Sequence, residues 1–336
     1  RQRQMCIRDR LHIGCVCLVW KLISSLLRVH GGVSEKQILY VNFITTLLFA
    51  VHPINVEAVA WISALKVLLY AFFYLLGLLC YLRYIRTSKI FYYVLTIGCF
   101  LCSFWGKEQA VTFPLALLIV DWFTNRNMKN LEVWSEKMSF LIMAFFFGII
   151  TVLSQGKGPY EMIFPLYQRL LFGCFALVEY ITKSLLPVNL NFFYPFPIVL
   201  GEEPPLHYYL YPVVLLFLMG WIIAYRNNRY LVFGVLLFLV NLLFSIHLFN
   251  MSRHAIVADR YMYLSYVGIA FLIANGIWWL RKRLSYFKAA LVFLFFYCFF
   301  LSVYTFHYTK KWENTTMVKK YTKEVLEKRL NGSNHL

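Results

Sequence analysis

Ten or eleven long apolar runs, separated by short polar turns, most constrain how this 336-residue chain can fold. A helix needs about 20 apolar residues to cross a bilayer, and the runs approach or reach that length. They are continuous rather than alternating, so each must satisfy its own backbone hydrogen bonds as a helix. The sequence therefore predicts an all-α, polytopic membrane protein with about 10–11 transmembrane helices. The predicted spans are 11–29, 36–51, 65–85, 89–105, 109–123, 138–155, 167–186, 209–225, 229–249, 259–280 and 286–306.

Basic residues predict which ends of these helices face the cytoplasm. Charged residues make up only 14% of the chain, against about 25% in soluble proteins, yet the net charge is +18. Lys and Arg in short turns are typical of cytoplasmic loops, and the charge then requires no nucleic-acid partner. These basic turns lie at 83–89, 126–129, 226–229 and 281–288. Four polar segments share the opposite, outward face, at 52–63, 105–109, 187–208 and 250–261.

The stretch between residues 138 and 208 breaks this alternation of faces. Two apolar runs join a cytoplasmic turn to an outward loop, where an odd number of spans is needed. One segment must therefore be re-entrant or interfacial. The candidates are 159–168 and NLNFFYPFPIVL, residues 189–200, because each contains two prolines.

Composition divides the chain into three parts. Residues 1–10, RQRQMCIRDR, resemble a sequencing adapter read in frame, so we expect them to be an artefact and the natural start to lie upstream. Residues 11–309 form the multi-span membrane domain. Residues 310–336 are polar and predict one amphipathic helix, with Val318, Tyr321, Val325 and Leu326 along one side.

Eight cysteines are scattered through the chain and do not predict a metal or redox site. The one CxxC, Cys99 to Cys102, lies in an apolar stretch with no nearby His or acid, which favours a packing role. We expect no metal and no certain cofactor.

FAVHPINVEAVAWISALK, residues 49–66, ends one apolar run with ionisable side chains at the membrane edge. His52, Asn55 and Glu57 can cap helix ends, with Pro53 opening the next helix. Ionisable groups beside lipid are costly without a partner or a water-filled cavity, which favours a functional site. In WGKEQ, residues 105–109, Lys107 and Glu108 allow two interpretations. They form either a surface ion pair or part of a functional site.

The densest polar cluster is SRHAIVADRYMYLSYVG, at the outward mouth of a predicted span. It holds Arg253, His254, Asp259, Arg260, Tyr261 and Tyr263. Arg binds phosphate through a bidentate fork that an Asp can orient, although interfacial anchoring also suits these residues. KSLLPVNLNFFYPFP adds Lys183 and Tyr194. The aromatic side chains of this loop either stack on a sugar or lie among lipid headgroups. Together these residues suit a substrate with an apolar tail and an anionic phosphate head.

Four segments resemble, in the same order, the membrane part of bacterial relatives of the TMTC (transmembrane and tetratricopeptide repeat) proteins. They are LFAVHPINVEAVAWISALK, GKEQAVTFPLALLIVDWF, LLPVNLNFFYPFP and ADRYMYLSYVGIAFLIA, and the resemblance covers roughly residues 11–310. That family belongs to the GT-C glycosyltransferases, which are similar to protein O-mannosyltransferases. The resemblance implies a GT-C-like fold in the bacterial inner (cytoplasmic) membrane.

The resemblance also implies transfer of a sugar from a polyprenyl-phosphate donor to an acceptor hydroxyl of a protein or glycan on the periplasmic face. A carboxylate would remove the acceptor proton while cations stabilise the departing phosphate. His52 and Glu57 match the family's H-P-x-x-V-E motif, Lys107 and Glu108 its K-E turn, and Asp259, Arg260 and Tyr261 its A-D-R-Y motif.

From these matches we expect specific roles. Arg260, Lys107 and His52 hold the phosphate, while Glu57 and Asp259, the catalytic candidates in this chain, orient them or contact the sugar. Tyr194 or Tyr263 lines the sugar pocket. Glu108 and Lys183 are further substrate-binding candidates.

Three departures from the family pattern predict that this chain is an inactive fragment. Leu65, Lys66 and Val67 stand where the family has an Arg-Lys-Asp run. The paired aspartates that would supply the base belong to a first outward loop before residue 11, and the repeats after the last span are missing.

Two non-enzymatic alternatives remain open from the sequence. A lipid-linked sugar flippase or other carrier would also need cations and aromatic residues near lipid, but it should line a route to both faces. Few polar residues lie inside the spans, Asn241 and His247 among them. A membrane scaffold would use the same clusters only to anchor helices.

Overall fold

The computed structural model describes residues 2–154, 164–198, 200–247, 255–314, 316–320 and 322–324. In these ranges the chain is helical without any strand, and an isolated bridge pairs Tyr194 with Val257. The predicted all-α class is confirmed. The longer helices are α1 (Gln2–His30), α2 (Glu35–Val51), α4 (Leu65–Thr87), α5 (Ile90–Gly106), α6 (Phe113–Phe123), α7 (Leu131–Ser154), α8 (Leu166–Leu185), α9 (Leu210–Ala224), α10 (Arg229–Leu242), α11 (Met262–Trp279) and α12 (Leu284–Lys310).

Short helices occupy one basic turn and the turns at the opposite end of the molecule, which is called the outward end because the charge pattern predicts that it faces outward. They are α3 (Val56–Ala60) and the 3-10 helices η1 (Pro53–Asn55), η2 (Ile62–Ala64), η3 (Glu108–Thr112), η4 (Leu206–Tyr209), η5 (Asp259–Tyr261) and η6 (Leu280–Lys282). Here α2 and the η1–α3 segment form a pair bent by 51° at His52.

The chain is a multi-pass membrane protein by the length and composition of its helices. Six helices in the described ranges are long and apolar enough to cross a bilayer, and the bent pair raises the number to seven. α5 and α10 are apolar but shorter. The predicted number of ten or eleven spans is therefore higher than the structure supports, because several apolar runs form short helices.

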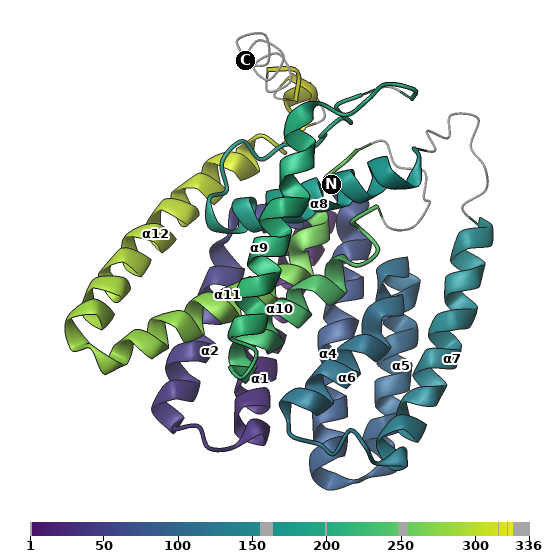
Figure 1. Ribbon diagram of the computed structural model, residues 1–336, viewed down its shortest axis with the longest axis vertical. Helices are drawn as coiled ribbons and strands as arrows, with labels where there is room; N and C mark the ends of the chain where they lie inside the picture. The colour runs from purple at the N-terminus through teal and green to yellow at the C-terminus, as the bar shows by residue number, and fades with distance from the viewer. Residues whose placement is uncertain are drawn as a thin grey trace.

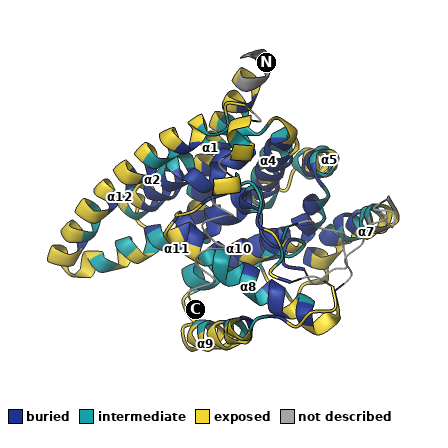
Figure 2. Cartoon of the chain, turned by 90° about the horizontal axis from the view of Figure 1, so that it is seen from above, coloured by how far each residue is buried: buried dark blue, intermediate teal, exposed yellow. Residues whose placement is uncertain are grey.

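Five helices, α1, α2, α4, α10 and α11, form the centre of the molecule (Figure 1). In α11, 56% of the most apolar segment is buried inside the molecule, against 6% in α9. Figure 2 shows this difference, with exposed residues along α9 and α12 and buried ones in the central helices. The exposed residues of the peripheral helices are mostly apolar, which suits contact with lipid.

Local sequence explains where several helices begin and end. The Ser34 hydroxyl accepts a hydrogen bond from the Gln37 amide at the start of α2, and Asn228 caps α10 in the same way. Ser88, with φ 53°, ends α4 in the left-handed conformation. Pro53 lies in the first turn of η1, where its missing N–H costs no hydrogen bond.

α8 explains why the two faces failed to alternate between residues 138 and 208. Its first turn contacts the 200–205 loop, where Gln168 donates a hydrogen bond of 2.9 Å to the Glu202 carbonyl. Its last turns contact the 257–260 segment, where Lys183 lies 3.4 Å from Asp259. Both ends of α8 thus lie at the outward end, and Figure 1 shows the helix running across it. The prediction of a span at 167–186 is corrected to an interfacial helix.

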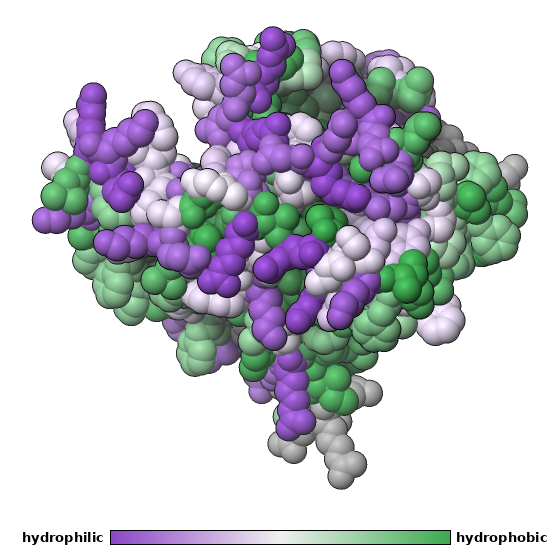
Figure 3. Space-filling model, turned by 90° about the horizontal axis from the view of Figure 1, so that it is seen from below, coloured by the Kyte–Doolittle hydropathy of each residue, from purple (hydrophilic) through white to green (hydrophobic). Residues whose placement is uncertain are grey.

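The opposite end carries the short basic turns, and Figure 3 shows hydrophilic residues gathered over it. The described part of the 189–200 segment is an irregular loop at the outward end. Some predictions fall outside the described residues: the first half of the 159–168 candidate, Arg253 and His254, and the tail positions Tyr321, Val325 and Leu326.

Candidate functional site

The outward end brings together side chains from four distant parts of the sequence. α3 supplies Glu57, the end of α5 supplies Lys107, α8 supplies Lys183, and η5 supplies Asp259 and Arg260. The predicted polar segments therefore share one end of the molecule.

Glu57 and Arg260 form the central ion pair of this end. The Arg260 guanidinium donates to Glu57 Oε1 at 2.5 Å, and the Arg260 backbone N–H donates to Oε2 at 2.8 Å. The Glu57 side chain is fully buried, whereas the Arg260 side chain is 21% exposed. The Arg260 guanidinium also lies 5.1 Å from the ring centres of Trp61 and Tyr261. Glu57 and the two rings fix the guanidinium, and one part of the Arg260 side chain stays accessible.

Asp259 organises a second group beside the first. The Tyr194 hydroxyl donates to both carboxylate oxygens, at 3.1 and 3.0 Å, and Lys183 Nζ lies 3.4 Å away. Lys183 Nζ is also 3.4 Å from the centre of the Tyr194 ring and 3.5 Å from Glu179. Burial, together with the neighbouring Asp259 carboxylate, raises the pKa of Tyr194 well above the ordinary tyrosine value. The phenol therefore stays protonated and acts as a donor.

Lys107 joins the first group through an aromatic ring. It ends α5, its side chain is buried, and its ammonium lies 4.4 Å from the centre of the Tyr261 ring. Tyr261 is thus shared by Arg260 and Lys107. Glu108 begins η3 and is half-buried. The Tyr261 ring therefore lies beside two cations, Lys107 and the Arg260 of the ion pair.

His52 and Asn55 have structural roles in the same turn. His52 Nδ1 accepts from the Ile54 amide at 3.2 Å, and the ring packs 4.2 Å from Tyr266. The Asn55 amide donates to the Phe49 carbonyl at 2.7 Å. Both contacts support the capping interpretation of this motif. The His52 side chain is buried, so its ring does not lie on the exposed surface of the site.

Tyr263 lies apart from these groups. It is buried in the helix bundle, where its hydroxyl is 2.7 Å from His12 Nδ1 and its ring is 5.2 Å from Phe49. Tyr194 is buried as well, beneath the loop that carries it. The two tyrosines expected to line a sugar pocket are therefore both buried, and of the two it is Tyr194 that supports the site, through Asp259.

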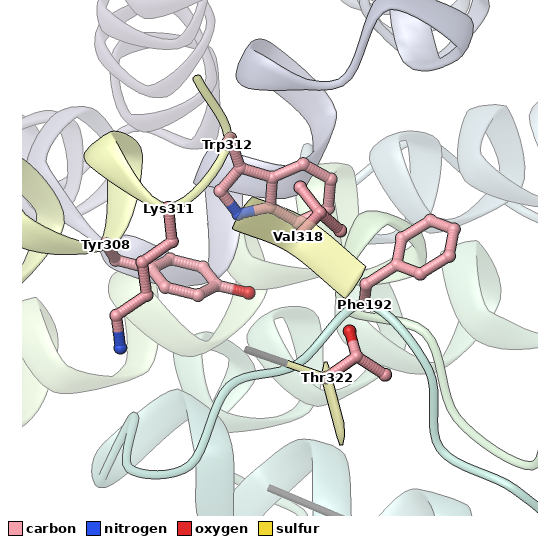
Figure 4. Close-up of a pocket in the computed structure, with 6 residues that line it drawn as sticks. All are labelled: Phe192, Tyr308, Lys311, Trp312, Val318 and Thr322. Carbon is pink, nitrogen blue, oxygen red and sulfur yellow. The ribbon is translucent and has the colours of Figure 1, made fainter. Parts of the chain in front are cut away.

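An aromatic wall that the sequence did not single out continues from Arg260. Trp61 contacts Phe192 at 5.1 Å between ring centres, and Phe192 contacts Trp312 at 5.9 Å. Trp61 follows Glu57 by four residues, one helical turn, which is the signal that could have identified it. A small pocket at the far end of the wall is lined by Phe192, Tyr308, Lys311, Trp312, Val318 and Thr322 (Figure 4).

The opposite end holds a separate network of buried charges. The Arg126 guanidinium binds both oxygens of Glu136, at 2.6 and 2.9 Å, and lies 3.2 Å from Asp121. Lys137 and Tyr81 both bind Asp121 from inside. The hydrogen bonds to Glu136 raise the pKa of Arg126. The network joins α4, α6 and α7, so Asp121 has a structural role at this end.

The described residues contain no group of three or more His, Cys, Asp or Glu side chains that could hold a metal ion.

Comparisons with known proteins identify partial relatives. No family model and no solved structure matches the chain. Over 101 residues it is 36% identical to protein O-mannosyl-transferase TMTC2 of Mus musculus, a match that covers 28% of this chain and 12% of that protein. Over 123 residues it is 31% identical to the TMTC2 protein of Xenopus laevis, covering 34% of this chain and 14% of that protein. Over 142 residues it is 26% identical to protein O-mannosyl-transferase Tmtc3 of Drosophila melanogaster, covering 37% and 15%.

Proposed function

We propose that this chain is the membrane part of a glycosyltransferase that transfers a sugar from a polyprenyl-phosphate donor to an acceptor hydroxyl of a protein or glycan at the outward face. The similarity to protein O-mannosyl-transferases supports sugar transfer and makes mannose the first sugar to test. One observation carries the proposal: Arg260 is held by the buried Glu57 and still has an exposed part.

The first step is recognition of the donor phosphate. A guanidinium offers several N–H groups, so Arg260 can keep its bond to Glu57 and bind a phosphate oxygen with another N–H. Lys107 adds positive charge behind Tyr261. As the sugar leaves, negative charge develops on the phosphate, and these fixed cations stabilise it more strongly than water would.

The second step concerns the carboxylates. Glu57 and Asp259 are both fully buried and both contact cations. A carboxylate in that situation orients its cation and is out of reach of an acceptor hydroxyl. We therefore assign Glu57 and Asp259 as positioning residues, and the base that removes the acceptor proton is another group, in line with the acidic pair that the family resemblance implies.

The third step is placement of the sugar. Trp61 lies between Arg260 and Phe192, so an aromatic face adjoins the proposed phosphate position. Aromatic rings provide flat apolar surfaces with limited freedom, which suits packing against a sugar ring. The wall at Trp61 and Phe192 takes the place that the sequence assigned to Tyr194 or Tyr263.

Binding of lipid-linked sugars to the purified chain tests this function. The chain in lipid nanodiscs is mixed with polyprenyl-phosphate mannose, polyprenyl phosphate or the uncharged polyprenol, and complexes are counted by native mass spectrometry. We expect binding to require the phosphate and to be strengthened by mannose. Arg260→Ala should weaken it about tenfold to a hundredfold, the range for hydrogen bonds to a charged group, while Arg226→Ala at the opposite end leaves it unchanged.

The nanodisc experiment tests the scaffold alternative, and a second experiment in sealed vesicles tests the carrier. A scaffold would bind none of the three lipids. A carrier would bind the donor when it is supplied from either side of a sealed vesicle. Binding of polyprenol as strong as that of polyprenyl phosphate would contradict the role of Arg260.

A further inference from the structure

A groove between α1 and α2 lies at the end that carries the basic turns, away from Arg260. It encloses about 370 Å³, within the roughly 300–1,000 Å³ of ligand sites. Arg28 and Lys36 stand at its rim, Trp20 and Leu39 form apolar walls, and Asn42 lies deeper along α2. Arg28 also pairs with Glu35 at 3.2 Å, so the rim carries two cations and one carboxylate.

Asn42 is the feature that marks this groove as a site. Its side chain is 2% exposed and lines the groove, and among the described residues its Oδ1 atom has no hydrogen-bond partner. A buried amide oxygen without a partner costs free energy, which a ligand or its bound water can relieve. Because the amide can turn about its last bond, Asn42 can offer either a donor or an acceptor to the ligand.

The order of these groups along the helix matches the depth profile of a lipid. Lys36 and Asn42 are six residues apart on α2, which corresponds to about 9 Å along the helix axis. The cations lie at the rim, where a headgroup phosphate lies, and the amide lies deeper, where ester groups and acyl chains begin. Trp20 and Leu39 are exposed on the outside of the bundle, so acyl chains can reach them.

We propose that the α1–α2 groove binds an anionic phospholipid of the leaflet on the basic side of the membrane. Basic grooves between membrane helices on this side suit acidic headgroups. A water-soluble anion would contact only the cations at the rim, and it would not contact the apolar walls or Asn42. The site is independent of the proposed sugar transfer. It lies between the last turns of α1 and the first turns of α2, at the end of the molecule opposite to Arg260.

Lipid add-back to delipidated protein tests this site. The full chain in detergent receives phosphatidylglycerol, phosphatidylcholine or inorganic phosphate, and the melting temperature and the bound lipid are measured. We expect phosphatidylglycerol alone to raise the melting temperature. The double variant Arg28→Gln, Lys36→Gln should weaken its binding about thirtyfold, the size expected for two basic groups beside an anionic surface.

Two further variants make the result specific. Asn42→Leu keeps the rim charges but removes the buried amide, and it should lower phosphatidylglycerol binding without abolishing the preference for a negative headgroup. Arg86→Gln with Lys89→Gln removes two exposed charges from another basic turn and should change nothing. Equal stabilisation by phosphatidylcholine, an equal response to inorganic phosphate, or full binding by the Arg28, Lys36 double variant would overturn the proposal.

Discussion

Each buried acid at the outward end is matched to one cation, Glu57 to Arg260 and Asp259 to Lys183. The sequence identified all four as site candidates because ionisable residues beside lipid need partners. It could not pair them, since Glu57 and Arg260 are 203 residues apart. Trp61 was not predicted as a site residue because a Trp near a membrane edge is usually an anchor. Tyr263 was predicted to line the sugar pocket because its motif does not show which side of α11 it faces.

Glu57→Gln should weaken donor binding although Arg260 is still present. The amide cannot hold the guanidinium with a negative charge, and stability should also fall by about 1–3 kcal/mol. Donor affinity and thermal unfolding measure the two effects. Glu132→Gln, an exposed acid at the opposite end, is the control and should change neither. Unchanged donor affinity in Glu57→Gln would show that Arg260 needs no positioning.

Tyr194→Phe should destabilise the loop that carries it. The hydroxyl donates to both oxygens of Asp259, and a hydrogen bond to a charged group contributes about 1.5–3 kcal/mol. Because the pKa of Tyr194 is raised in the folded state, its contribution is full below the unfolded pKa of about 10 and is lost as the pH rises above it. The variant should therefore lose less stability between neutral and alkaline pH than the natural chain. Tyr209→Phe, at a more exposed tyrosine, should melt like the natural chain.

α10 and α11 approach each other closely at two glycines, Gly234 and Gly268. A Cβ atom on Gly268 would lie 2.5 Å from the Gly234 carbonyl oxygen and 2.7 Å from the Phe238 nitrogen. Both neighbours are backbone atoms and cannot move aside, so Gly268→Ala should separate the helices and lower the melting temperature. Gly276→Ala, in the same helix with open space around it, is the matched control. Equal melting of the two variants would contradict this packing.

The network around Asp121 holds α4, α6 and α7 together at the basic end. Asp121→Asn leaves the buried Lys137 with Glu136 as its remaining charged partner, and the lost charge on Asp121 should lower stability by about 1–3 kcal/mol. Because the network lies at the opposite end from Arg260, the folded fraction should keep its donor affinity. Thermal unfolding and donor binding, measured on the same sample, test whether the two ends are separable.

Apolar runs predicted where helices would form but not how every helix would lie. α8 reads as a span by length, yet it includes Arg169, Glu179 and Lys183, and charges at these intervals are typical of a helix that lies along an interface. The position of α8 becomes clear only in the folded chain, where its two ends contact the 200–205 loop and the 257–260 segment. For this reason the sequence predicted that one segment does not cross the membrane, but the candidates were 159–168 and 189–200 and not α8.

At the scale of the whole molecule, the interfacial position of α8 predicts labelling from one side. Tyr167→Cys and Leu186→Cys, both exposed and at opposite ends of α8, should react with an impermeant maleimide added to the outward side of sealed vesicles. Lys89→Cys, in a basic turn, should react only from the other side. The background is a variant without its native exposed cysteines. Reaction of the two α8 positions from opposite sides would show that α8 crosses the membrane.

In the proposed function, Arg260 is held by Glu57 and contacts the phosphate of a polyprenyl-linked sugar. The most direct measurement is the ³¹P resonance of polyprenyl-phosphate mannose in nanodiscs that contain the natural chain or Arg260→Ala. This contact predicts a shifted resonance with the natural chain and with Arg226→Ala, and an unshifted one with Arg260→Ala. The same shifted resonance in Arg260→Ala would contradict it, because the phosphate would then bind elsewhere.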